Sequence, residues 1–333
     1  MSIFKTFLLV FSLILNSGTL SFAKNKVSSL VIDRYEKGAT ISLYRSLISG
    51  ENEKKGAIEL YNLGIMNLSR DTGKAIAYFK KSAKKGVVKA KFNIGSHYLS
   101  LVKNKHNRDK AKIWFQKAAK QKFPPAQYNL AIILGEYSET DENKARAIEL
   151  YTSAAKSGHA PAQTNLGVIF AKGEGVEKNL EKAIEYFSLG AEQNYTLAFY
   201  NLGVAYEEKN RILSSPIYNI YAVRWYKRAA LRGNLKSMIN LGTMLSREIG
   251  SVKDLKEAHK WVNISIAIKC RHDRLACKWS EELFEGPATP IINFLWDLRI
   301  EIERQMKPAQ IEEAHTVAKR LILQNKFIRE QTK

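Results

Sequence analysis

An internal repeat runs through most of this 333-residue chain. A strip of the form Tyr-Asn-Leu-Gly recurs with small changes, and its asparagines are spaced 31, 36, 36, 36 and 39 residues apart. A second, ten-residue strip follows each copy, and its first alanines are spaced 36, 36, 36, 39 and 36 residues apart. Two strips that share one period predict an array of similar units. The asparagines are Asn62, Asn93, Asn129, Asn165, Asn201 and Asn240.

Both strips have the pattern of amphipathic helices. In KAIEYFSLGA (182–191), an Ala, two aromatic residues and a small residue stand at positions i, i+3, i+4 and i+7. These positions lie on one face of a helix, where small residues let a neighbouring helix approach closely. In the first strip, another apolar residue follows the Gly by three positions, as Tyr206 follows Gly203. Each repeat therefore contains two helices.

Residues typical of helix ends also recur at fixed positions of the repeat. Left-handed C-terminal caps are expected at Gly86, Gly158, Asn194 and Gly233, and Pro125 and Pro161 stand where the next helix starts. One helix pair cannot bury its own apolar stripe, whereas stacked pairs bury a continuous core. The sequence therefore predicts an all-α protein, a right-handed α-solenoid of stacked antiparallel helix pairs with capping helices. A three-residue insertion is expected in the loop NRILSSPIYNIY (210–221).

The repeat resembles the Sel-one-like repeat (SLR) family, which is related to the tetratricopeptide repeats. The resemblance covers residues 38–269 and rests on A-x-x-N-L-G-x-x-Y, a loop, and then K-A-x-x-W/Y-F/Y-x-K-A-A-x-x-G. The family's loop motif G-x-G-V appears once, at 173–176. The resemblance implies an interaction protein of a bacterial envelope, such as a regulator, an assembly scaffold or an exported host-interaction factor.

The first residues have the pattern of a secretory signal peptide, residues 1–23. Lys5 precedes an apolar run at 7–15, and Ser21 and Ala23 stand at the −3 and −1 positions of a cleavage site. Nine apolar residues span only about half of a ~30 Å hydrocarbon core, which favours a cleaved signal over a permanent anchor. We therefore expect export, to the periplasm first and to the cell surface or medium second. An uncleaved signal anchor is the alternative.

The remaining chain divides into three parts. Residues 24–56 are expected to form N-terminal capping helices with a partial repeat, and residues 57–269 form six repeats. Residues 270–333 are expected to form C-terminal capping helices, the last of which begins at Pro308.

The asparagine row is a candidate partner-binding groove. By resemblance to tetratricopeptide solenoids, the first helix of each pair lines a concave surface on which an Asn before Leu-Gly clamps an extended peptide. An amide offers both a donor and an acceptor, so it can bind a peptide backbone whatever the side chain. The alternative is that the asparagines bond neighbouring repeats and stabilise stacking. Aromatic residues that precede four of them and would add contacts are Tyr61, Phe92, Tyr128 and Tyr200.

A basic surface is the second candidate site. The chain carries a net charge of +21, and residues 70–122 hold 16 Lys and Arg but only two Asp. Such a charge exceeds what solubility requires. In an exported protein it favours an anionic membrane or an envelope polymer as partner, and no nucleic acid. The exposed side of one second-strip helix carries Lys80, Lys81, Lys84 and Lys85.

The sequence offers little for catalysis. Motifs for phosphate binding, zinc proteases and serine hydrolases are absent, so we expect no catalytic residues and no cofactor. Some cysteine-rich relatives suggest a β-lactam-binding or β-lactam-hydrolysing enzyme. Ser-x-x-Lys sequences occur at Ser82, Ser100 and Ser153, of which Ser82 and Ser153 are the candidates. Ser82, however, fills a small packing position in the other repeats.

Two cysteines close the list of candidate sites. Cys270 and Cys277 are expected either to form a disulfide at a helix corner, to remain free thiols, or to bind zinc with His272. Export favours the disulfide. Structural zinc needs four ligands and only three are nearby, so no metal site is predicted.

These features together predict a monomeric, non-catalytic scaffold or regulator of the bacterial envelope. Its partner is expected to be another protein, held as an extended segment in the groove. The basic surface would bring it to an anionic membrane or polymer.

Overall fold

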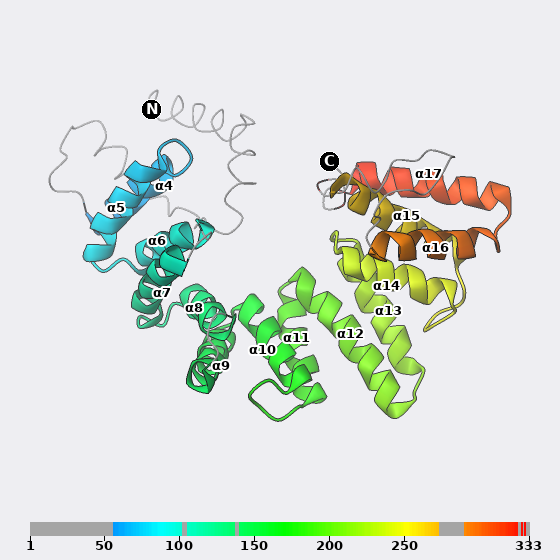
Figure 1. The fold of residues 1–333 in the computed structure, drawn as a ribbon, viewed down its shortest axis with the longest axis horizontal. Helices are drawn as coiled ribbons and strands as arrows, with labels where there is room; N and C mark the ends of the chain where they lie inside the picture. The colour runs from blue at the N-terminus through cyan, green and yellow to red at the C-terminus, as the bar shows by residue number, and fades with distance from the viewer. Residues whose placement is uncertain are drawn as a thin grey trace, which may run out of the picture. The chain divides into compact units, whose positions relative to one another are not determined.

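A computed structural model describes residues 56–101, 105–136, 140–272 and 290–325, together with Ile328 and Glu330. These residues form fourteen α-helices, labelled α4 to α17 in Figure 1. The prediction of an all-α solenoid is confirmed, because successive helices pack as antiparallel pairs and neighbouring pairs stack. The chain divides into two compact units, Met1–Ala154 and Ala155–Lys333.

The first unit contains three helix pairs. Helix α4 packs against α5 and α6 against α7, while α5–α6 and α7–α8 contacts join successive pairs. Tyr61, Phe79 and Ile94 lie in a buried cluster between the first two pairs. The helices are α4 (Ala57–Asn67), α5 (Thr72–Lys84), α6 (Val88–Ser100), α7 (Lys105–Ala119), α8 (Pro124–Glu136) and α9 (Asp141–Lys156), which ends just beyond the boundary.

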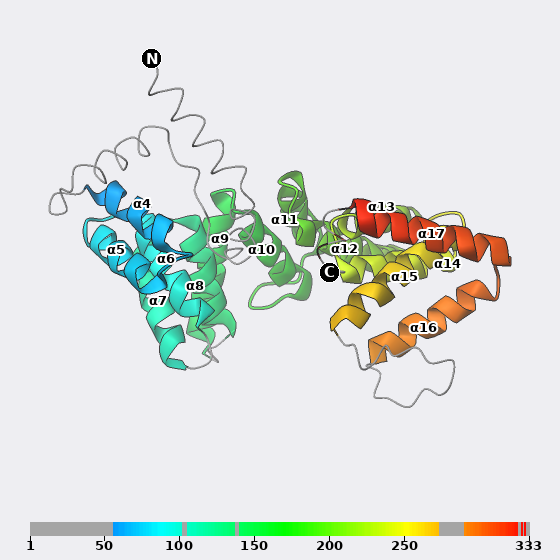
Figure 2. The ribbon, with the colours of Figure 1, turned by 90° about the horizontal axis from the view of Figure 1, so that it is seen from above.

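The second unit continues the pattern and then departs from it. Helix α10 packs against α11, α12 against α13, and α14 against α15. The last two helices both pack against α15, as Figure 2 shows. The helices are α10 (Ala160–Lys172), α11 (Leu180–Glu192), α12 (Thr196–Leu213), α13 (Ile217–Ala230), α14 (Leu235–Ser246), α15 (Leu255–His272), α16 (Pro290–Glu303) and α17 (Pro308–Gln324).

The glycine of the first strip, which is Ala131 in the copy on α8, is required by the packing within the pairs that carry it. A Cβ atom placed on Gly64 would lie 2.4 Å from a ring carbon of Phe79, and one on Gly203 would lie 2.4 Å from the Tyr226 ring. Real Cβ atoms do not approach a ring so closely, so the aromatic residue of the second helix rests directly on the glycine backbone. The two strips therefore recur together because the glycine of the first strip and the aromatic residue of the second strip contact each other.

The predicted helix ends are confirmed. The four expected left-handed residues have φ angles between 60° and 97°. The corresponding residue of the second repeat is Lys122, which also has a positive φ, 56°. Sequence reasoning missed it because a lysine carries no signal for this conformation. Pro125 and Pro161 are the second residues of α8 and α10, where a backbone N–H has no helical partner in any case.

The expected position of the three-residue insertion is only partly right. Helix α12 runs for 18 residues to Leu213, whereas α10 has 13 residues, so much of the segment 210–221 is helical. Ser214 then ends the helix with φ 49°, and α13 starts at Ile217 after a short connection. The segment NRIL lacks a glycine or proline that would stop the helix earlier.

The C-terminal helices complete the core of the second unit. Leu295 and Leu298 of α16 and Ala318 of α17 share a buried cluster with Trp261 of α15. Pro308 is the first residue of α17, as predicted. Within the described ranges, no helix is both long and apolar enough to cross a membrane. The predicted signal peptide, most of the N-terminal cap 24–56, and Cys277 lie outside the described residues.

Candidate functional site

The asparagine row follows the first helix of each pair, but burial divides it. Asn62 on α4 and Asn93 on α6 are only 3% and 2% exposed, and their Nδ2 atoms lack a hydrogen-bond partner in the described part of the chain. The other four asparagines, Asn129, Asn165, Asn201 and Asn240, are half-buried. A half-buried amide is accessible to a ligand, whereas the two enclosed amides are not.

The aromatic neighbours divide in the same way. Tyr61 and Phe92 are buried and pack against Phe79 and Phe115, each with ring centroids 5.7 Å apart. Tyr128 and Tyr200 are half-buried. Their rings lie beside Tyr151 (5.9 Å) and Tyr226 (6.1 Å). The first two residues therefore serve the core, and the last two retain surface for a ligand.

A polar network surrounds the row in the second unit. The fully buried Tyr226 donates a hydrogen bond to Glu207, and its hydroxyl also interacts with Asn240, which lies on the next helix, α14. Burial and the nearby Glu207 carboxylate both raise the pKa of Tyr226, so its hydroxyl stays protonated. The same causes raise the pKa of Tyr200. Asn240 is therefore placed for the stacking role that the sequence offered as the alternative to peptide binding, while its half-buried amide keeps peptide binding a prediction as well.

Asn201 differs from Asn240. It lies on α12 between α10 and α14, and α12 contacts both of these helices. Its half-buried side chain makes no hydrogen bond to another described residue. The nearby Tyr200 ring has the Lys236 ammonium 5.9 Å from its centroid. This part of the row thus combines an available amide, an aromatic face and a positive charge.

The basic surface lies on α5, as expected from the repeat. The side chains of Lys80, Lys81, Lys84 and Lys85 are exposed, and none forms an ion pair with another described residue. Their charge affects a neighbour, because Lys80 adds to the effect of burial in lowering the pKa of His97. These lysines are free to meet an external anion.

The serines of the Ser-x-x-Lys sequences have structural surroundings. Ser82 is fully buried, and its Oγ donates a hydrogen bond of 2.6 Å to the carbonyl oxygen of Ala57. Ser153 Oγ accepts a hydrogen bond of 2.9 Å from Gln127 Nε2. A nucleophilic serine needs access to its substrate and an adjacent base. Ser82 instead joins α5 to the start of α4.

Cys270 lies near the end of α15 and is disulfide-bonded. Cys277 lies outside the described residues, so the Cys270–Cys277 pair stays a prediction. The side chain of His272 is not described either.

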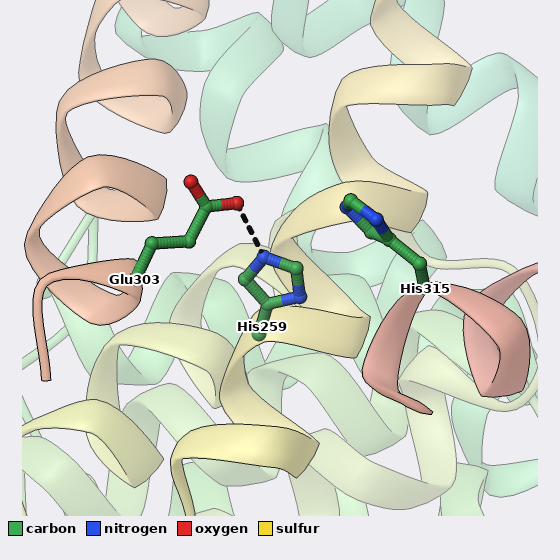
Figure 3. Close-up of side chains that lie close together, drawn as sticks. All are labelled: His259, Glu303 and His315. Atoms are coloured by element: carbon green, nitrogen blue, oxygen red, sulfur yellow. Dashed lines mark hydrogen bonds and ion pairs between the residues drawn. The ribbon is translucent and has the colours of Figure 1, made fainter. Parts of the chain in front are cut away.

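A cluster that the sequence did not predict lies among the last three helices. His259 of α15, Glu303 of α16 and His315 of α17 point toward one another in Figure 3. One ligand atom from each residue lies within 4.8 Å of the other two. His259 Nε2 is 2.7 Å from Glu303 Oε1, and the two histidine rings have centroids 4.9 Å apart. The cluster is partly enclosed, since His259 is fully buried and the other two are half-buried.

Two further side chains hold this cluster. Asn263 Nδ2 lies 2.9 Å from His259 Nδ1, and Arg299 Nε donates a hydrogen bond of 2.6 Å to Glu303 Oε1. Burial lowers the pKa of both histidines, although the bond to Glu303 opposes this at His259. Burial acts to raise the pKa of Glu303, but its bonds to His259 and Arg299 outweigh that effect and lower it. Neutral imidazoles and an ionised carboxylate therefore face one another.

Sequence reasoning missed this cluster for a physical reason. The three residues are far apart in the sequence, and two of them lie beyond the repeat, where no period relates one helix to the next. One weak indication of the cluster was present in the sequence. His259 stands at the third position of the second strip, where four of the other five copies have Ile or Val. Only the packing of α16 and α17 on α15 brings the side chains together.

The fold and the candidate surfaces define a helical-repeat protein whose repeating unit is a stacked helix pair. The Sel1 repeat model matches residues 56–87, 88–123, 124–159, 160–195, 219–234 and 235–266, which is more than half of the chain. The chain belongs to the Sel1 repeat family, a family of protein-interaction scaffolds that are generally non-catalytic. The unmatched segment 196–218 contains the lengthened α12.

Solved structures of SLR proteins from bacteria are similar to this chain. A Sel1 repeat protein from Oxalobacter formigenes is 25% identical, with a TM-score of 0.56 over 68% of this chain and 95% of that one. The protective antigen c5321 of uropathogenic Escherichia coli, which has an SLR fold, is 21% identical, with a TM-score of 0.51 over 87% of this chain and 73% of that one. A search of the curated proteins found no match.

Proposed function

We propose that this protein is a non-catalytic scaffold or regulator of the bacterial envelope that holds an extended segment of a partner protein. The family's general role as an interaction scaffold supports the proposal. The observation that carries it is the series of half-buried amides on α10, α12 and α14 of the second unit, namely Asn165, Asn201 and Asn240.

The chemistry of these amides suits a peptide backbone. Each side chain can donate to a carbonyl oxygen and accept from an N–H group. One such bond adds a net ~0.5–1.5 kcal/mol, so a few of them give weak binding without further contacts. The ring of Tyr200, the residue before Asn201, has the ammonium group of Lys236 5.9 Å from its centroid, and these two groups would supply those contacts. The partner segment is therefore expected to be extended and to carry some apolar and acidic side chains.

The cellular location and a second, anionic partner are proposed from features of the sequence. The signal-peptide pattern of residues 1–23 supports export, to the periplasm in preference to the medium. The unpaired lysines of α5 support contact with an anionic membrane or envelope polymer. The protein would then present its partner beside that surface.

The groove is tested with the double variant Asn165→Ala/Asn201→Ala. Partners are captured by cross-linking from the native envelope, where the mature chain is expected to begin at Lys24. The double variant is expected to lose capture while its melting temperature stays close to that of the wild type. Asn210→Ala is the matched control, because Asn210 is also half-buried on α12 but lies nine residues from Asn201, on the opposite face.

Two results would contradict the groove. Undiminished capture by the double variant would show that these amides do not contact the partner. A large fall in the melting temperature of the double variant would instead show that Asn165 and Asn201 stabilise the stacking of repeats.

A further inference from the structure

The cluster of His259, Glu303 and His315 has the donor set of a metal site. Two imidazole nitrogens and one carboxylate are ligands that zinc accepts readily. Calcium and magnesium prefer sites made wholly of oxygen atoms. The three side chains come from three different helices and converge in a partly enclosed space (Figure 3). We propose that these three residues bind one zinc ion, with a water molecule in the fourth position.

The distances require only small movements. Ligand atoms around a tetrahedral zinc ion lie about 3.3 Å from one another, given metal–ligand bonds of ~2.0–2.1 Å. His259 Nε2 and Glu303 Oε1 are closer than this, at 2.7 Å, and the widest separation in the cluster is 4.8 Å. The half-buried His315 can turn toward the other two ligands. The buried His259 supplies the fixed point of the site.

The surrounding side chains can prepare His259 as a ligand. In the present arrangement Asn263 Nδ2 donates to Nδ1 of His259, so the ring proton is on Nε2 and points to Glu303. A turn of the Asn263 amide would place its oxygen opposite Nδ1. The ring proton then moves from Nε2 to Nδ1, and the Nε2 lone pair becomes available to zinc. Metal-bound histidines commonly hold their second nitrogen in this way.

Positive charge limits the affinity of the site. Arg299 is bonded to Glu303, and both Arg299 and Lys319 lower the pKa of His315 through their charge. The same charges repel a divalent cation. Replacement of Arg299 by a neutral residue is therefore expected to tighten zinc binding. If Glu303 served only to hold Arg299 and His259 in place, this replacement would not increase the affinity for zinc.

Isothermal titration calorimetry with zinc chloride tests the proposal on the whole mature chain without reductant, since Cys270 is disulfide-bonded. The wild type is expected to bind one equivalent of zinc. Glu303→Gln and His315→Ala are each expected to bind at least about tenfold more weakly, and Arg299→Gln several-fold more tightly. His106→Ala is the matched control, because this exposed histidine lies in the first unit and its loss should change nothing.

A second measurement guards against loss of structure. Zinc is expected to raise the melting temperature of the wild type, and a chelator should reverse this, because a ligand that binds only the folded state stabilises it. Circular dichroism of each variant identifies any that fails to fold. Wild-type protein that binds no zinc overturns the proposal. So does binding that His315→Ala leaves intact, or that His106→Ala abolishes.

Discussion

At the scale of single residues, the repeat period predicts backbone conformation as well as burial. Gly86, Gly158, Asn194 and Gly233 were predictable as left-handed caps because Gly and Asn adopt positive φ more readily than other residues. Lys122 occupies the same position without that chemistry, and its side chain gives no warning of it. The position was therefore predictable from the period but not from the residue.

The strain at Lys122 can be measured. Lys122→Gly is expected to raise the free energy of unfolding by about 0.5–1 kcal/mol, because glycine adopts φ 56° without the steric cost that a Cβ atom brings. Chemical denaturation of both proteins gives this difference. The control is Gln116→Gly at an exposed position within α7, which should lower the free energy of unfolding by about 1 kcal/mol. If Lys122→Gly lowers the free energy of unfolding, the lysine side chain stabilises the folded protein by more than its positive φ destabilises it.

At the scale of elements, the helix pairs were predictable and their departures from the period were not. Small residues at fixed positions indicate close pairs, and the contact of Gly203 with the Tyr226 ring confirms them. The length of α12 was missed because the repeat period shows that three residues are inserted, but it does not show whether they lengthen the helix or the loop. The cluster of His259, Glu303 and His315 was missed because it depends on helices that follow no repeat.

The start of α10 makes one element sensitive to acid. His159 is the N-terminal cap of this helix, and its Nδ1 accepts a hydrogen bond of 3.3 Å from the backbone N–H of Ala162. Burial lowers the pKa of His159 from 6.5 to about 4. Because the folded state has the lower pKa, the unfolded chain binds the proton first. Stability is therefore full above about pH 6.5 and falls as the pH drops toward 4.

The expected loss is on the order of 1–2 kcal/mol at pH 4, after allowance for the partial exposure of the ring. It is measured by urea denaturation between pH 7 and pH 4. His159→Asn should keep the cap, since Asn also accepts from the helix N-terminus, and should reduce the pH dependence. An equal fall in stability with pH in this variant would place the acid sensitivity at other groups.

At the scale of the whole molecule, the charge is concentrated in one unit. Residues 70–122 carry 16 of the 53 basic residues and only two acidic ones, and they lie entirely within Met1–Ala154. The second unit instead contains ion pairs such as Lys172–Glu174 and Lys178–Glu208. The sequence alone located this asymmetry, and the repeat pattern also predicted the exposed side of α5 on which the lysines lie.

Anionic vesicles test the basic surface. The protein is expected to bind phosphatidylglycerol vesicles at low salt and to dissociate as salt rises through ~0.15 M, where charges are screened beyond ~8 Å. Replacement of Lys80, Lys81, Lys84 and Lys85 by Gln should weaken this binding severalfold in a co-sedimentation assay. Replacement of the ion-paired Lys172 and Lys178 by Gln is the control and should have little effect. Binding that persists at high salt would exclude an electrostatic origin.

The contact between an aromatic ring and a glycine backbone limits which helices can be exchanged between repeats. Gly64 and Gly203 accept rings, whereas Gly242 faces the smaller Val262, whose Cγ2 atom would lie 2.9 Å from an added Cβ. A single helix exchanged between the copy with Val262 and a copy with an aromatic ring would meet a counterpart of the wrong size and leave a void or a clash. Recombination, natural or engineered, should therefore succeed when both helices travel together as one cassette.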